Sequence, residues 1–114
     1  MVSQGGRAGG QEQATGFEGA AARADDVAAY AKADPESAII VVGRLGAGER
    51  SHSLAWLRLR AVRTYLSVDK KLTNEIVLAE GDRAHALGCV EIYVSGQLRT
   101  TITVARNRNI RFYE

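Results

Sequence analysis

The sequence predicts an α/β fold of the sandwich type, with helices packed on a mixed β-sheet. Residues 38–43 form a continuous apolar run rich in β-branched side chains, which is typical of a strand buried on both faces. A glycine-rich turn, a helical pattern over residues 50–66 and a second apolar run over residues 75–79 follow in that order. A strand, a helix and a strand in succession predict a parallel pair joined by a right-handed crossover.

The flanking segments predict one more helix and a β-rich end. Residues 20–33 are rich in helix formers and Pro35 follows them, so we expect a helix ending near Ala33. Residues 80–88 are expected to form a loop. Apolar and polar residues alternate over 90–94 and again over 98–104, which predicts two half-buried strands. Residues 110–113 then complete a predicted basic β-hairpin, which either closes this sheet or adds a strand to a partner's.

Length and composition are those of one domain. The chain has 114 residues, 46% of them hydrophobic, which is enough to bury a core without metal or disulfide support. Residues 1–16 contain five glycines and almost no large apolar residue, and are expected to be a disordered arm. We expect the α/β domain over residues 17–97 and a basic, β-rich C-terminal extension over residues 98–114.

The sequence shows no feature of membrane insertion or export. No apolar run approaches the roughly 18 residues that a transmembrane helix needs, and the first residues lack the apolar segment of a signal peptide. Cys89 is the single cysteine, so an internal disulfide is excluded. The chain as given is expected to be cytoplasmic unless a leader is missing.

One arginine stands where an apolar residue is expected. In the helix over residues 50–66, the apolar side chains share one arc, and Arg58 projects from the middle of it. A guanidinium that faces the core keeps its charge and therefore needs an anionic partner. The partner is either a side chain, for which Asp82 is a candidate, or an anionic ligand. Arg58 is the leading candidate for a binding residue.

The basic residues concentrate in that helix and in the tail. Residues 50–71 carry six basic and one acidic side chain, and residues 99–114 carry four basic and one acidic. Trp56 lies opposite the apolar arc and shares a helix face with Arg60 and Arg63. Such a face, with the tail arginines, suits a nucleic acid or another anionic polymer. The alternative is that Trp56 is covered by the tail or by another helix. The arginines of the tail are Arg106, Arg108 and Arg111.

The remaining motifs do not support catalysis, a cofactor or a metal. The turn over residues 43–48 resembles a phosphate loop but lacks the lysine after its last glycine, and Glu49 at that position would repel phosphate. His85, Cys89 and Asp82 are too few for a zinc site. No serine, histidine and acid are placed so as to mark an activated nucleophile. We expect a non-enzymatic protein.

The order and spacing of these segments resemble the OmpA-like domain, the peptidoglycan-associated C-terminal domain of outer membrane protein A. The resemblance covers about residues 17–95. It rests on the helix ADDVAAYAKADPES, the strand AIIVVG with its glycine, the helix bearing Leu54, Arg58, Val62, Tyr65 and Leu66, the strand IVLAEG, and the final VEIYV. The implied fold is a β-α-β-β core preceded by a helix.

The resemblance also implies a function and a site. OmpA-like domains bind the diaminopimelate of peptidoglycan through an aspartate and an arginine, and the arginine falls on Arg58. The aspartate position, three residues after the glycine of the strand, is occupied by Gly46. Glu49, in the same loop, offers a carboxylate at a different spacing, and Asp82 would line the same end of the sheet. The implied protein is a non-catalytic binding or structural module of the bacterial cell envelope with a degenerate diaminopimelate site. Its partners would be peptidoglycan or an envelope protein, and its location the periplasm or envelope.

Overall fold

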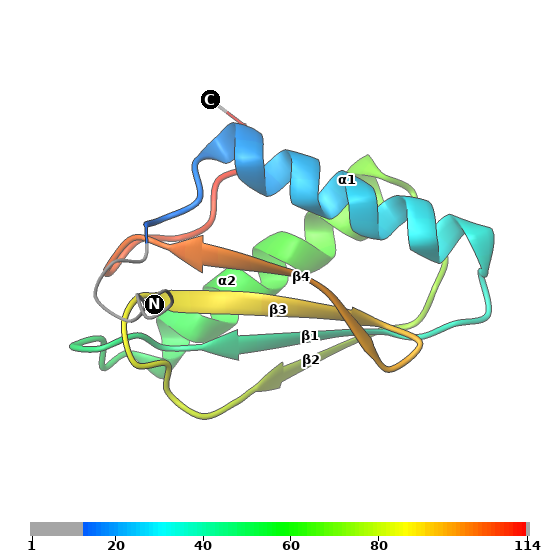
Figure 1. The fold of residues 1–114 in the computed structure, drawn as a ribbon. Helices are drawn as coiled ribbons and strands as arrows, with labels where there is room; N and C mark the ends of the chain where they lie inside the picture. The colour runs from blue at the N-terminus through cyan, green and yellow to red at the C-terminus, as the bar shows by residue number, and fades with distance from the viewer. Residues whose placement is uncertain (1–12, 114) are drawn as a thin grey trace, which may run out of the picture.

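The predicted architecture is confirmed: two α-helices and a four-stranded mixed sheet form an α+β fold (Figure 1). The computed structural model describes residues 13–113, so most of the predicted N-terminal arm lies outside the described residues. The elements in chain order are α1 (Phe17–Ala33), β1 (Ile39–Arg44), α2 (His52–Thr64), η3 (Tyr65–Asp69), β2 (Ile76–Glu80), β3 (Gly88–Val94) and β4 (Gln97–Val104). η3 is one π-helical turn that continues α2.

The sheet has the strand order β2-β1-β3-β4. β1 and β2 are parallel and joined through α2, as the crossover predicts, while β3 pairs antiparallel with both β1 and β4. Residues 98–104, which we expected in an extension, therefore belong to the same sheet as β1. Among the described residues, none of the helices is long and apolar enough to cross a membrane.

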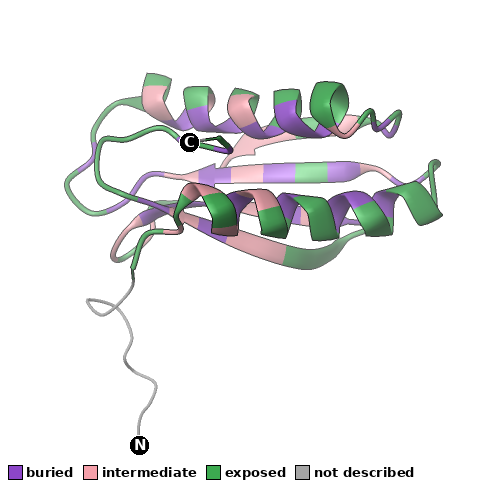
Figure 2. Ribbon diagram, turned by 90° about the horizontal axis from the view of Figure 1, so that it is seen from above, coloured by how far each residue is buried: buried purple, intermediate pink, exposed green. Residues whose placement is uncertain are grey.

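Both helices pack on one face of this sheet. The alternate residues Ile39 and Val41 of β1 are fully buried and belong to one core cluster with Val27 of α1 and Leu59 of α2. On each helix the buried residues lie along one side and the exposed residues along the opposite side (Figure 2). The core is thus the layer between the helices and the sheet, and the other face of the sheet carries the remaining alternate residues.

A buried amide ties the end of α1 to the loop before β2. The side-chain nitrogen of Asn74 donates to the carbonyl oxygen of Ser37 at 2.9 Å and lies 3.1 to 3.2 Å from the carbonyl oxygens of Asp34 and Ala31. Asn74 is 8% exposed, so these carbonyl groups satisfy a polar group that is shielded from water. The residue pattern before β2 gave no sign of this contact.

The predicted second strand of the C-terminal hairpin does not form. Residues 105–113 contain no strand; instead they turn and return along the helix side of the sheet, beside α2. Ile110 and Phe112 are each 8% exposed, and the Phe112 ring stacks on Tyr65 with 4.3 Å between centroids. Alternating apolar residues are compatible with any extended segment that buries one side. Here the side chains of Ile110 and Phe112 pack beside α2, and the backbone of this segment does not pair with β4. We call residues 105–113 the C-terminal strap.

Candidate functional site

Arg58 points into the protein and not toward solvent. α2 begins after Ser51, whose side-chain oxygen accepts a hydrogen bond from the Leu54 amide at 3.4 Å, as an N-cap residue does. This start sets the phase of the helix so that Arg58 lies between the buried residues Ala55, Leu59 and Val62. The Arg58 side chain is 1% exposed. The placement on the buried arc is as the helical periodicity predicts.

The anionic partner of Arg58 is Glu49. Nη1 of Arg58 lies 2.9 Å from Oε1 of Glu49, and Nη2 lies 2.5 Å from Oε2, which is the bidentate geometry of a guanidinium with a carboxylate. Glu49 is also 1% exposed. Both charges are shielded from water. The desolvation cost of each must therefore be offset by the other charge and by further hydrogen bonds.

The remaining polar atoms of this pair contact the backbone of two loops. Nε of Arg58 donates to the carbonyl oxygen of Arg108 at 2.9 Å, and Nη2 lies 3.4 Å from that of Ala105. The Glu49 carboxylate accepts the amide of Gly46 at 2.8 Å and the amide of Asn107 at 2.7 Å. We call these six residues the Arg58–Glu49 cluster. It joins α2, the loop after β1 and the C-terminal strap.

Two close approaches leave the cluster no room for larger side chains. A Cβ atom on Gly46 would overlap the backbone nitrogen of Gly88 and would lie 2.7 Å from the carbonyl oxygen of Ala86. A Cβ atom on Gly88 would lie 2.6 Å from Nη1 of Arg58 and 2.7 Å from Oε1 of Glu49. An aspartate at position 46 is therefore incompatible with this path of residues 86–88.

The environment of Glu49 keeps it ionised. Burial acts to raise the pKa of the Glu49 carboxyl, but the hydrogen bonds from Arg58, Gly46 and Asn107 and the Arg58 charge outweigh it and lower the pKa to about 2. A second arginine holds the same loop from outside, because Arg83 Nη1 donates to the carbonyl oxygens of Gly46, at 2.6 Å, and of Glu49.

The structure brings three of the four predicted ligand-binding residues together: Arg58, Gly46 and Glu49. Asp82 is exposed, and its carbonyl oxygen accepts a hydrogen bond from Arg44 at 3.0 Å. The sequence analysis missed the strap residues of the cluster, because backbone carbonyl and amide groups carry no residue-type signal. The sequence carried one local signal, the asparagine at position 107. Asparagine tolerates the left-handed conformation in turns, and Asn107 adopts it with a φ of 60°.

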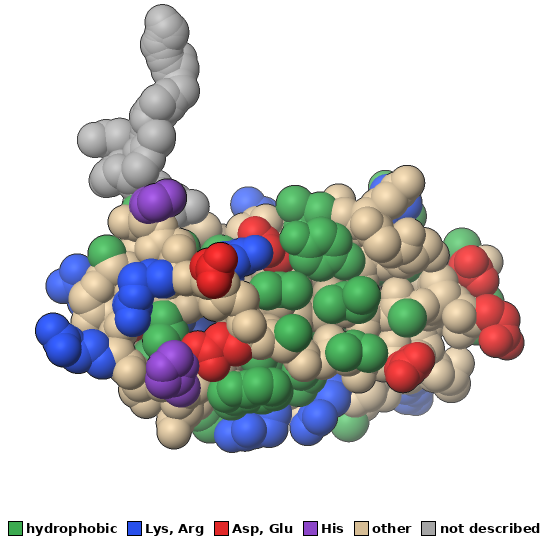
Figure 3. All heavy atoms as spheres, turned by 90° about the horizontal axis from the view of Figure 1, so that it is seen from below, with side chains coloured by type: hydrophobic (Ala, Val, Ile, Leu, Met, Phe, Trp, Pro, Cys, Tyr) green, Lys and Arg blue, Asp and Glu red, His purple; other side chains and the backbone are tan. Residues whose placement is uncertain are grey.

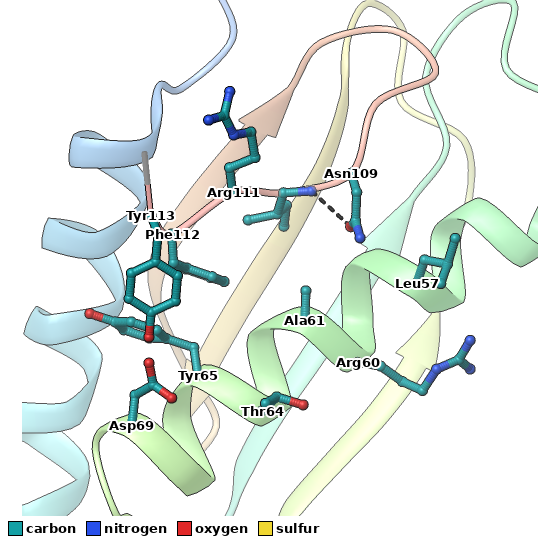
Figure 4. A pocket seen from close by; sticks show the side chains of 11 residues that line it. Leu57, Arg60, Ala61, Thr64, Tyr65, Asp69, Asn109, Arg111, Phe112 and Tyr113 are labelled. Atoms are coloured by element: carbon teal, nitrogen blue, oxygen red, sulfur yellow. Dashed lines mark hydrogen bonds between the residues drawn. The ribbon is translucent and has the colours of Figure 1, made fainter.

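The predicted partner-binding face is less exposed than expected. Trp56 is half-buried and packs against the core, while Arg60 and Arg63 are exposed. A shallow groove of about 490 Å³ runs between α2 and the strap (Figure 4). Its lining includes Arg60, Arg111 and Tyr113, and Tyr113 is 63% exposed.

The described residues contain no group of three or more His, Cys, Asp or Glu side chains that could hold a metal ion. Comparison with known proteins adds no assignment: no protein-family model, curated protein or solved structure matches this chain.

Proposed function

We propose that this chain is a non-catalytic structural module of the bacterial cell envelope. It would be a divergent OmpA-like domain in which Arg58 stabilises the fold and no longer binds a ligand. The observation that carries the proposal is the complete enclosure of Arg58, which is 1% exposed and bonded to Glu49 and to the strap. A ligand carboxylate could reach Arg58 only by displacing Glu49, which already supplies both oxygens at hydrogen-bond distance.

Two further features support the same proposal. The elements α1, β1, α2, β2 and β3 follow in the order on which the OmpA-like resemblance rests. The family's aspartate position is held by Gly46, where the backbone of residues 86–88 leaves no space for a carboxylate side chain. The degenerate diaminopimelate site would thus have lost its aspartate for a steric reason, and Glu49 would have taken over the guanidinium.

The first test is co-sedimentation of the purified protein with intact peptidoglycan sacculi. We expect wild type to stay in the supernatant at the level of a non-binding control, while an OmpA-like domain that has both the aspartate and the arginine sediments with the sacculi. An Arg58→Lys variant retains a charge for Glu49 but loses the bidentate geometry. Saturable binding by wild type that weakens about tenfold in folded Arg58→Lys would contradict the structural role.

A second candidate function, binding of an anionic polymer, is favoured by one observation. The strap lies beside α2, so Arg60 of the helix and Arg111 of the tail line the same groove, with the exposed Tyr113 ring at one end (Figure 4). A basic groove that also presents an aromatic ring is a feature of surfaces that bind single-stranded nucleic acid. Asp69 also lines the groove and opposes this function.

The test of this candidate is fluorescence anisotropy with a labelled single-stranded DNA oligonucleotide. If the groove binds the polymer, Arg60→Glu with Arg111→Glu should weaken binding about tenfold or more, and binding should fall with salt concentration. The control pair Lys32→Glu with Lys71→Glu changes the net charge equally but lies outside the groove. Equal losses in both pairs, or no binding by wild type, would exclude the groove as a nucleic-acid site.

A further inference from the structure

A pocket of about 650 Å³ lies where the start of α1, the end of β4 and the strap come together (Figure 1). It is on the helix side of the sheet, because Ile102 and Val104 of β4 line it and belong to the core cluster. Phe17 of α1 and Ile110 of the strap supply further apolar walls. We call this hollow the strap pocket. Its volume is within the range of roughly 300 to 1,000 Å³ that is usual for small-molecule sites.

The charged side chains that line the strap pocket are cationic. Arg108 and Arg111 line it, and none of its described lining residues is acidic. Within residues 13–113, the Arg108 guanidinium has neither a hydrogen bond nor an ion pair. The backbone of Arg108 is nevertheless held in place, since its carbonyl oxygen accepts a hydrogen bond from Nε of Arg58 at 2.9 Å. The buried cluster thus fixes the position from which the Arg108 side chain extends.

The start of α1 adds to the positive potential around the strap pocket. Its N-cap residue is Gly16, which offers no side-chain oxygen to the first amide groups of the helix and lines the pocket. Those amide groups carry the positive end of the helix dipole. Glu18, the acidic residue of the first turn, is exposed and is not among the lining residues. An anionic group in the pocket therefore meets both a helix start and an arginine.

We propose that the strap pocket binds a small amphiphile with one anionic head group, of the fatty-acid type. The carboxylate head lies at Arg108, and the apolar chain lies against Ile102, Val104 and Ile110. A purely polar anion would leave these apolar walls in contact with water, whereas a neutral apolar molecule would leave the guanidinium without a counter-charge. The combination of apolar walls and cationic side chains is what selects an amphiphile.

The test is isothermal titration calorimetry of the purified chain with octanoate, 1-octanol and acetate. We expect saturable binding of octanoate with a dissociation constant between about 10 µM and 1 mM, and binding of 1-octanol and of acetate at least about tenfold weaker. Arg108→Gln removes the charge and should weaken octanoate binding about tenfold. Arg106→Gln is the matched control, because Arg106 is exposed on the same strap but does not line the pocket.

Amide chemical shifts measured by NMR during the same titration locate the bound octanoate. We expect the amides of Gly16 and Arg108 to shift. The face of the sheet opposite the helices also presents apolar side chains, gathered in its middle (Figure 3). Ile40 and Val77 are exposed on that face, and their amides should not shift. Largest shifts at Ile40 and Val77, or at Leu57 in the groove beside α2, would overturn the proposal.

Three calorimetric results would also overturn it. These are equal weakening by Arg106→Gln and Arg108→Gln, equal affinities for octanoate and 1-octanol, and no binding of octanoate up to about 10 mM. The result is independent of the sacculus and oligonucleotide tests, because Arg108→Gln leaves Arg58, Arg60 and Arg111 in place.

Discussion

Replacement of Arg58 by methionine should lower the free energy of unfolding by about 3 to 5 kcal/mol. The substitution retains much of the side-chain volume but removes the charge that Glu49 faces at 2.5 and 2.9 Å. Glu49 is 1% exposed and would remain as a buried carboxylate with two backbone amides as partners. The strap would also lose the hydrogen bond to the Arg108 carbonyl oxygen. Urea denaturation followed by circular dichroism measures the change.

The control for this prediction is Arg60→Met in the same helix. Arg60 is exposed, so its replacement should change the free energy of unfolding by less than about 0.5 kcal/mol. The double variant Arg58→Met with Glu49→Leu removes both charges and should be less destabilised than the sum of the two single variants. Additive losses would show that the two charges are not energetically coupled. A loss under about 1 kcal/mol for Arg58→Met would show that the pair contributes little to the fold.

Acidification should destabilise wild type by about 3 kcal/mol through Glu49 alone. The pKa of Glu49 is lowered to about 2 in the folded state, against an ordinary value of 4.5. A carboxyl with a lowered pKa contributes its full stabilisation above the unfolded-state value and loses it as the pH falls toward the folded-state value. The loss therefore occurs between about pH 5 and pH 2, at roughly 1.4 kcal/mol for each unit of pKa difference.

The contribution of Glu49 can be separated from that of other carboxylates by the variant Glu49→Gln. The glutamine does not titrate, so wild type should be the more stable protein at pH 7, and its advantage should shrink by about 3 kcal/mol on going to pH 2. Denaturant curves at several pH values measure both proteins. An advantage that is the same at pH 7 and at pH 2 would mean that Glu49 titrates normally in the folded protein.

The order of helices and strands follows from the sequence because it depends on local patterns. The β-branched run over residues 38–43 and the period-2 alternation of residues 90–94 each occur within a few residues of chain, and both correspond to observed strands. The helical periodicity likewise placed Arg58 on the buried side of α2. Local spacing determines which face of an element a residue occupies, since the period of each element is fixed.

The partners of those faces were decided by the tertiary structure. The sequence analysis named Asp82 as a candidate for Arg58, whereas Glu49 and the strap meet it. Trp56 was placed on an outer face, yet it packs against the core. Residues 110–113 were expected to complete a hairpin, but they cover α2 instead.

The sequence by itself determined the class of fold, the succession of elements and the need of Arg58 for an anion. Only the tertiary structure decided that this anion is Glu49 and that residues 105–113 close over α2. The physical reason is that these contacts join residues as much as 58 positions apart, such as Glu49 and Asn107. Their geometry depends on strand register and loop path, and neither is encoded in the period of a single segment.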